Sequence, residues 1–357
     1  RHRTPPTRPA PAPRVPDPLV VSPPLRVADD AASLRSIAAP EEETREEGGG
    51  PAKRLDWFTE QRAYPGDRLP TEARLKAYDE MRRMSQLLDS QTQETWTNIG
   101  PAPMRDSVIG QQQVDVTGRV TALAVDPRDP NVIYLGAAQG GLWKSNDDGA
   151  SWTPLTDDQP SLAIGAVTLD PQNPDVIYVG TGEPHASLDS YYGAGILKSS
   201  DAGKTWQQLG AREFTGLGIS SIIVHPSDAN LVYAASSAAV GAVGPRLPSQ
   251  GVFQSTDGGQ TWRGLRVCSS CYGASDLVMD RSNPSILYAA FWLEGVFKSS
   301  DGGQTWHKLT NGLPAQHFAR IELAIAPSNP SVLYAGFDMS ILGQYTGAQV
   351  FKSTDGG

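Results

Sequence analysis

The sequence predicts an all-β fold, a β-propeller of four-stranded antiparallel blades, and three observations lead to this prediction. Beyond residue 95 the chain repeats one set of alternating strands at intervals of 44 to 56 residues. Each repeat carries a motif of the form S-x-D-x-G-x-[ST]-W. The composition, with 36 Gly, 29 Pro and 19% charged residues, is typical of a globular protein rich in turns.

The N-terminal part of the chain differs from the repeats. Residues 1–50 contain ten of the 29 prolines and the run EEETREEGGG, so they bury too little apolar surface to fold and are expected to form a disordered tether. Residues 51–94 form a helical extension in this interpretation. Its helix, expected over 71–88, has apolar residues at helical spacing: Leu75, Tyr78, Met81, Met84 and Leu88.

The propeller is predicted over residues 95–357. In each repeat a strand such as GRVTALAVDP leads to a turn, a second strand such as NVIYLG follows, a third enters the motif, and a short fourth follows the tryptophan. A two-sheet sandwich is the alternative, but it would not repeat its strand sequences. The expected blades are 118–157, 162–210, 218–266, 274–310 and an incomplete 319–357.

The repeated motif is expected to be a structural turn between the third and fourth strands. Its aspartate can accept backbone N–H groups, its glycine tolerates positive φ, and its tryptophan supplies buried aromatic area. The residues concerned are Asp147, Gly149, Trp152, Asp201, Gly203, Trp206, Asp257, Gly259, Trp262, Asp301, Gly303, Trp306 and, in the last copy, Asp355.

These motifs resemble the Asp-box, or bacterial neuraminidase repeat, of sialidases, sortilin-like ectodomains and xyloglucanase-type glycoside hydrolases. The resemblance implies that the motif is structural and lies on the face opposite the ligand site. The stretches GRVTALAVDP, NVIYLGAAQGGLWKS and VIYVGTGE look most like sortilin-type bacterial exported propellers. Xyloglucanases are expected to have an aspartate where this chain has Ala138, and the RIP signature of sialidases is absent near Arg119.

A ligand site is expected on the loops between second and third strands, because all the length variation falls there. From the second-strand tyrosine to the motif serine the distance is 11, 21, 22, 11 and 19 residues in the five repeats. The distance from the motif serine to the tyrosine of the next repeat varies only from 33 to 35 residues. An ordinary self-packed loop would have the same composition. The candidate ligand-binding residues are Glu183, His185, Asp189, Tyr191, Tyr192, Arg246, Trp292, Glu294 and Tyr345.

Two functions remain open on this evidence. An exported module that binds a glycan, peptide or protein is favoured. The alternative is a glycoside hydrolase, xyloglucanase-like or sialidase-like, which needs two carboxylates on the loop-bearing face; Glu183, Asp189 and Asp338 are the catalytic candidates. Similar propellers also act as assembly factors for membrane complexes in photosynthetic organisms, but no basic patch for that role is evident.

Net charge and cysteine content bear on the classes of partner and on the compartment of the protein. A net charge of −9 without a Lys/Arg stripe argues against nucleic acid, and no apolar run reaches the length of about 18 residues that spans a bilayer. Cys268 and Cys271 are expected to form a small loop disulfide, as in an exported protein. No spacing predicts a metal or cofactor.

The final residues STDGG repeat the start of the motif. We expect them to be the turn of a fifth blade in a longer propeller. The stretch ETWTNIGP at residues 94–101 is expected to be a closing strand.

Overall fold

The computed structural model describes residues 73–87, 104–109, 112–116, 118–185, 190–238, 250–268, 272–316, 318–341 and 344–357. The predicted tether over residues 1–50, the strand near Trp96 and the side chains of the cysteine pair lie outside this part. No helix among the described residues is long and apolar enough to cross a membrane.

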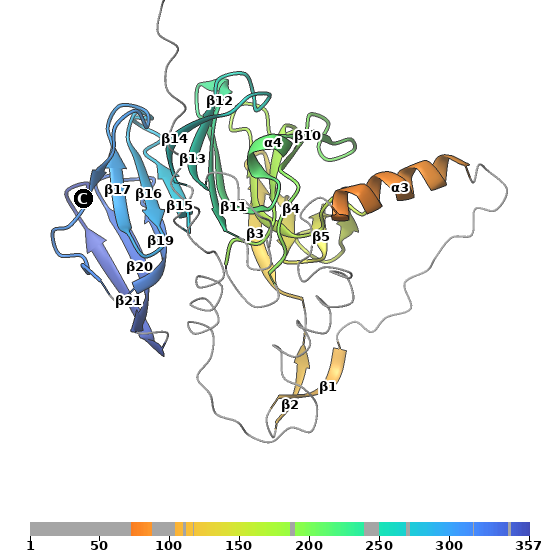
Figure 1. Ribbon diagram of the computed structural model, residues 1–357, viewed down its shortest axis with the longest axis horizontal. Coiled ribbons are helices and arrows are strands. Elements are labelled where there is room, and N and C mark those ends of the chain that lie inside the picture. Colours follow the sequence, from red (N-terminus) through yellow and green to blue (C-terminus); the bar gives the residue numbers. More distant parts are fainter. Residues whose placement is uncertain are drawn as a thin grey trace, which may run out of the picture.

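Five antiparallel sheets, called here blades 1 to 5, confirm the propeller prediction (Figure 1). The first four have four strands each, and the described part of the fifth has three. Their strands are β3 (Val120–Asp126), β4 (Asp129–Ala137), β5 (Gly141–Ser145) and β6 (Thr153–Pro154); β7 (Ile164–Leu169), β8 (Ile177–Thr181), β9 (Ile196–Ser199) and β10 (Gln207–Leu209); β11 (Leu217–His225), β12 (Asp228–Ala238), β13 (Gln250–Ser255) and β14 (Arg263–Cys268); β15 (Ala274–Met279), β16 (Leu287–Phe291), β17 (Gly295–Ser299) and β18 (His307–Lys308); and β19 (Phe318–Ile325), β20 (Leu333–Ile341) and β21 (Gln344–Ser353).

Three further elements lie outside the blades. Helix α3 (Ala73–Leu87) falls within the range expected for a helix, and its Tyr78 hydroxyl donates a hydrogen bond to the carbonyl of Asp158 in blade 1. Strands β1 (Met104–Ile109) and β2 (Gln112–Val116) form a separate hairpin. The short helix α4 (Ala211–Phe214) connects blades 2 and 3.

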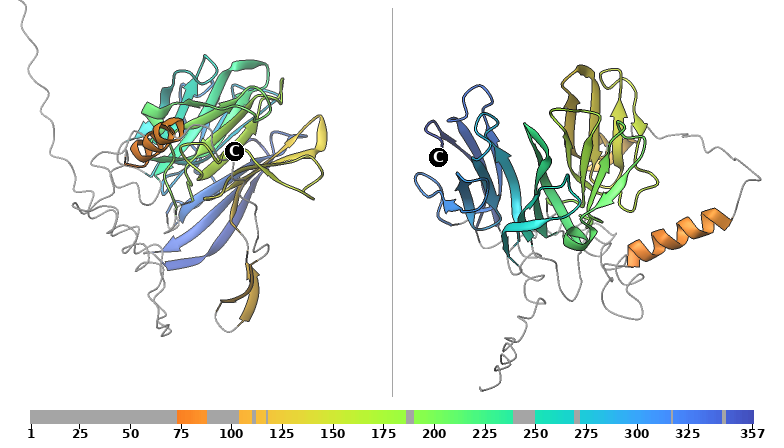
Figure 2. Two further views of the ribbon diagram at one scale, coloured as in Figure 1. Left: turned by 90° about the vertical axis from the view of Figure 1, so that its right-hand side faces the viewer. Right: turned by 90° about the horizontal axis from the view of Figure 1, so that it is seen from above.

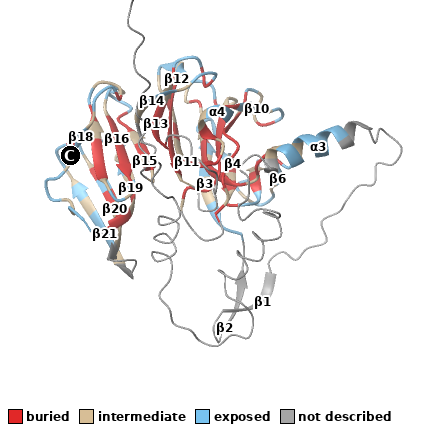
Figure 3. Ribbon diagram, in the orientation of Figure 1, coloured by how far each residue is buried: buried red, intermediate tan, exposed pale blue. Residues whose placement is uncertain are grey.

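The blades stand side by side in sequence order, as Figure 2 shows. The first strand of each blade contacts the first strand of the next: β3 with β7, β7 with β11, β11 with β15 and β15 with β19. The apolar cores lie between the sheets, one for each pair of neighbours, and Figure 3 shows this buried material along the strands. Burial between neighbouring blades is therefore the main apolar contribution to the fold.

The repeated motif forms the expected turn in each blade. In blade 1 the Asp147 carboxylate accepts hydrogen bonds from the backbone N–H of Ser151 at 2.8 Å and from the Ser145 hydroxyl at 2.7 Å. Gly149 has a φ of 85°, a value that a side chain would oppose. Trp206, Trp262 and Trp306 pack against the cores shared with the preceding blade, and the indole N–H of Trp206 donates to the carbonyl of Leu155 at 2.9 Å.

Candidate functional site

The two ends of the blades carry different chemistry. Because neighbouring strands in a blade are antiparallel, the motif turns all lie at one end, called here the turn end. The opposite end, called the loop end, carries the starts of the first strands and the loops between second and third strands. The candidate residues of the sequence analysis that the structure describes belong to the loop end.

An ion pair between a fully buried carboxylate and a half-exposed arginine joins blades 1 and 2 at the loop end. The Glu183 side chain follows β8 and is 0% exposed, and its Oε2 lies 2.6 Å from Nη2 of Arg119, which directly precedes β3. The backbone fixes this position, because the N–H of Glu183 donates to the carbonyl of Tyr191 and that of Gly182 donates to Ala163. Among the described residues, Oε1 of Glu183 has no hydrogen-bond partner.

His185 lies beside this ion pair. Its Nδ1 is 3.9 Å from Oε1 of Glu183, and 28% of its side chain is exposed. Burial lowers the pKa of His185 to about 4, and the positive charges of Arg320 and Arg119 lower it in the same direction. The imidazole is therefore neutral at pH 7. Since Arg320 belongs to β19, a charge from blade 5 acts on this histidine together with the charge of Arg119 from blade 1.

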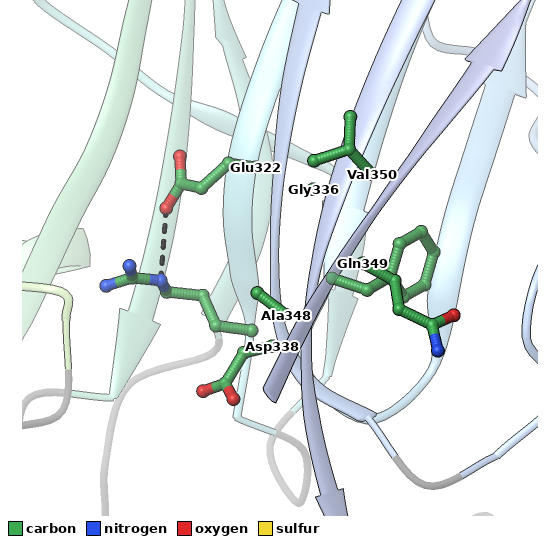
Figure 4. Close-up of a pocket in the computed structure, with 8 residues that line it drawn as sticks. Glu322, Gly336, Asp338, Ala348, Gln349 and Val350 are labelled. Carbon is green, nitrogen blue, oxygen red and sulfur yellow. Dashed lines mark ion pairs between the residues drawn. The ribbon is translucent and has the colours of Figure 1, made fainter. Parts of the chain in front are cut away.

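The face of blade 5 carries a cavity of about 310 Å³ that is lined by Arg320, Glu322, Gly336 and Asp338, among others (Figure 4). Nε of Arg320 lies 3.2 Å from Oε1 of Glu322. The Glu322 side chain is 49% exposed; partial desolvation and the nearby charge of Asp276 raise its pKa to about 7, while Arg320 acts in the opposite direction. Glu322 can thus hold or release a proton near neutral pH.

Asp276 occupies the same place in blade 4 as Glu322 in blade 5. In register, Asp276 faces Ala290 and Glu322 faces Gly336. Burial raises the pKa of Asp276 to about 6, although its carboxylate accepts hydrogen bonds from the N–H groups of Leu323 at 2.8 Å and Leu277 at 2.7 Å. This carboxylate is part of the contact between blades 4 and 5.

The other predicted residues are spread along the loop end. Tyr192 is buried, so its ring packs inside the protein, whereas Tyr191 is half-buried. Glu294 pairs with Arg266 at 2.7 Å, and this guanidinium stacks 3.9 Å from the ring centre of Phe297. Trp292 on the same loop is half-buried.

Three of the expected ligand-binding residues cannot be placed. Asp189 and Arg246 lie outside the described residues, and Tyr345 lies in β21 with its side chain outside them. Within the described ranges, no group of three or more His, Cys, Asp or Glu residues is arranged to hold a metal ion.

Sequence reasoning missed Glu322 and Asp276. Both lie in first strands, where the alternation of apolar residues predicts core. A signal was available in the alignment of the repeats, because the corresponding residues of blades 1 to 3 are small: Ala122, Ala166 and Ser221. A charged residue at a position where the other blades have a small residue marks these two carboxylates as unusual.

Comparison with known proteins gives relatives among xyloglucanases, and no protein-family model matches the chain. A probable oligoxyloglucan-reducing end-specific xyloglucanase of Neosartorya fischeri is 30% identical over 174 residues, 46% of this chain and 19% of that protein. A Paenibacillus xyloglucanase is 27% identical over 173 residues, 40% of this chain and 16% of that protein. The chain therefore matches less than a fifth of the length of either curated relative.

Solved structures give the same fold. An ancestral GH74 enzyme matches with a TM-score of 0.54 and 27% identity, over 66% of this chain and 30% of that one. A GH74 enzyme of Niastella koreensis matches with a TM-score of 0.51 and 24% identity, over 67% and 37%, which shows likeness of fold. This chain is a β-propeller similar to these enzymes. The closer likeness to sortilin-type propellers stays a prediction.

Proposed function

We propose that this chain binds a neutral glycan at the loop end, through Arg119, His185 and Arg320. The observation that carries the proposal is that Glu183 lies between Arg119 and His185, and that the charges of Arg119 and Arg320, from blades 1 and 5, both act on His185. Guanidinium and imidazole groups donate hydrogen bonds in fixed directions, as recognition of sugar hydroxyl groups requires. The xyloglucanase names of the relatives support a glycan as the ligand class.

The charge of the site favours a neutral ligand over an anionic one. Arg119 faces the carboxylate of Glu183, Arg320 faces that of Glu322, and His185 is neutral at pH 7. Each guanidinium charge is thus matched by a nearby carboxylate, whereas the carboxylate of a sialic acid requires an excess of positive charge. A peptide or protein ligand, the other class expected from the sequence, gains no specific support from this arrangement.

Binding can be tested with a panel of soluble neutral and acidic polysaccharides in affinity electrophoresis. The wild-type chain is expected to be retarded by at least one neutral polysaccharide, and Arg320→Ala is expected to weaken binding about tenfold or more. Arg281→Ala is the matched control, because Arg281 is an exposed arginine in the turn after β15, at the turn end. Equal retardation of both variants, or none by any neutral polysaccharide, would refute the proposal.

A glycoside hydrolase is the second candidate, and one observation favours it. Glu322 and Asp338 line the same cavity, and Glu322 has a pKa raised to about 7, suited to a general acid. Because Asp338 lies two residues beyond Gly336, the register partner of Glu322, the two residues are diagonal neighbours on one face of the sheet, with Cα atoms about 7–8 Å apart. Inverting glycosidases separate their carboxyl groups by about 6.5–9.5 Å.

The hydrolase candidate is tested by sugar release from xyloglucan and other polysaccharides. Glu322→Gln and Asp338→Asn are each expected to abolish turnover, whereas Arg281→Ala is expected to retain it. Turnover that survives both substitutions would exclude this pair.

Export of the chain, expected from the cysteine pair, stays a prediction. Peptide mapping can show whether the expected disulfide is present.

A further inference from the structure

The segment 182–185 at the loop end lies in a narrow space between blades 2 and 3. A Cβ atom on Gly165, in β7, would lie 2.7 Å from Cδ of Pro184. A Cβ atom on Gly218, in β11, would lie 2.8 Å from the backbone nitrogen of Pro184. Glycine at both positions therefore lets the two strands approach the segment more closely than any other residue would allow.

Hydrogen bonds fix the same segment from two sides. The N–H of Glu183 donates to the carbonyl of Tyr191 at 2.8 Å, and the hydroxyl of Ser237, in β12, donates to the carbonyl of Pro184 at 3.3 Å. The proline ring also restricts its own φ to a single region. The backbone thus presents the side chains of Glu183 and His185 in one arrangement.

The two carboxylate oxygens of Glu183 have different surroundings. Oε2 lies 2.6 Å from Nη2 of Arg119, a group that can only donate hydrogen bonds. Oε1 is buried, and among the described residues it accepts no hydrogen bond. A buried acceptor without a donor is unfavourable. Nδ1 of His185 lies 3.9 Å from Oε1, so a proton on this nitrogen would supply a donor within reach.

The charge of Glu183 favours one of the two neutral forms of His185. A neutral imidazole bears a proton on one ring nitrogen and a lone pair on the other. With the proton on Nδ1, an N–H group lies beside the carboxylate and is attracted to it, whereas a lone pair on Nδ1 would be repelled. The distance of 3.9 Å exceeds that of a hydrogen bond, and a shortening by about 1 Å on ligand binding would form one.

We propose that Glu183 holds His185 in the tautomer with its proton on Nδ1, so that Nε2 accepts a hydrogen bond from a hydroxyl group of the bound glycan. This inference rests on the proposed glycan binding at the loop end. Glu183 is a positioning residue in this role, because its carboxylate is fully buried and acts through the imidazole. Arg119 and Arg320 can only donate hydrogen bonds. His185 therefore supplies the acceptor that a sugar hydroxyl group needs for its own proton.

His225 provides an internal reference with the opposite tautomer. Its Nδ1 accepts a hydrogen bond from the backbone N–H of Ser227 at 3.3 Å. The neutral form of His225 therefore carries its proton on Nε2. The two histidines are thus expected to differ in a way that one NMR spectrum of the free protein records.

Long-range proton–nitrogen NMR spectra of the full chain, isotopically labelled in its histidines, test the tautomers at pH 7. His185 is expected to be protonated on Nδ1 and His225 on Nε2. The spectrum of the His185→Gln variant assigns the signals of His185 by their loss. A wild-type chain in which His185 is protonated on Nε2 overturns the proposal.

Glu183→Gln is expected to reverse the tautomer of His185. Because Arg119 only donates, it takes the amide oxygen, and the amide NH2 group then faces Nδ1 of His185. Nδ1 must accept from this group, so the proton moves to Nε2. Glu80→Gln is the matched control and should leave the tautomer unchanged, because Glu80 forms an exposed ion pair with Arg83 in helix α3. A proton that persists on Nδ1 in Glu183→Gln overturns the positioning role.

Affinity electrophoresis with each neutral polysaccharide that retards the wild type tests the acceptor role. Glu183→Gln is expected to bind about tenfold more weakly, because Nε2 then carries a proton where the ligand hydroxyl also donates. A reversed tautomer with unchanged affinity overturns the acceptor role. A reversed tautomer in a protein that no neutral polysaccharide retards refutes the proposed function and supports the positioning of His185. Circular dichroism checks the folding of each variant, and the wild-type spectrum decides the tautomer where Glu183→Gln does not fold.

Discussion

The hydroxyl of Tyr178 in blade 2 donates a hydrogen bond to the carbonyl of Gly258 in the motif turn of blade 3, over 3.1 Å. The same contact recurs between Tyr233 and Gly302 and between Tyr288 and Gly356, so the tyrosine and the motif turn share a role at the boundary between blades. The tyrosine is 1% exposed, so its hydroxyl group has no water to exchange for the carbonyl. The motif therefore stabilises both its own hairpin and the boundary with the preceding blade.

Replacing this tyrosine tests the contact. Tyr178→Phe is expected to lower the free energy of unfolding by about 1 kcal/mol, because the buried ring stays while the hydrogen bond is lost. Lys198 remains 2.9 Å from the same carbonyl, which limits the effect. Tyr334→Phe is the matched control, because Tyr334 is 39% exposed, and it should leave stability unchanged. Urea unfolding of both variants gives the comparison, and equal effects would contradict the assigned role.

The glycine two residues after the second-strand tyrosine makes a second contrast, between blades 2 and 5. Gly180→Ala places a methyl group 2.5 Å from the Cβ of Ile219, and overpacking of this kind is expected to cost about 2 kcal/mol. Gly336→Ala adds the same methyl group where the nearest atom is 4.0 Å away, and no destabilisation is expected. Thermal unfolding of the two variants separates them. A tolerated Gly180→Ala would show that the blade boundary adjusts freely.

Repetition along the sequence made the fold predictable, because the blades share the same alternation of apolar and polar residues and the same turn motif with its tryptophan. The candidate site was predictable in part. Length variation pointed to the loop that holds Glu183 and His185, but not to their burial, which depends on how blades 1 and 2 meet. Arg320, Glu322 and Asp276 lie within first strands. Alternate side chains of a strand point to opposite faces of the sheet, so the sequence shows which residues share a face but not which residues of the next blade lie opposite them. The proximity of these three charges depends on how blades 4 and 5 pack.

Acid should weaken the motif turns together. Hydrogen bonds, mainly from the hydroxyl and N–H of the residue four positions on, lower the pKa of Asp147, Asp201, Asp257 and Asp301 to about 2, below the model-peptide value of 3.8. The folded state therefore binds fewer protons than the unfolded state, and stability is lost as pH falls from about 4 to 2. Melting temperatures across this interval should decline. Asp201→Asn should lessen the decline, and an unchanged slope would argue against this cause.

The burial of His185 predicts a second loss of stability on acidification, in a pH range above that of the motif turns. Its pKa falls from 6.5 to about 4 on folding, so between these values the unfolded chain binds a proton that the folded chain does not. Stability should accordingly fall as pH falls from 6.5 toward 4, by about 3 kcal/mol at most. His185→Gln should remove this interval of pH dependence. Chemical denaturation at pH 7 and pH 4.5 gives the measurement, and a wild type equally stable at both would contradict it.

The ion pair of Arg119 and Glu183 gives the last contrast. Arg119→Ala removes the guanidinium, on a side chain that is 43% exposed, which lies 2.6 Å from a fully buried carboxylate. Glu183 is left without its charge partner, which is expected to destabilise the fold, by less than the loss of a fully buried pair because solvent reaches the arginine. Arg119→Ala combined with Glu183→Gln removes both charges, so the double variant should recover part of that loss, although each single change is destabilising. Urea unfolding of the wild type, both single variants and the double variant closes the cycle. Additive effects would mean that the two charges do not interact, and the loop end would then lack the fixed arginine on which glycan binding depends.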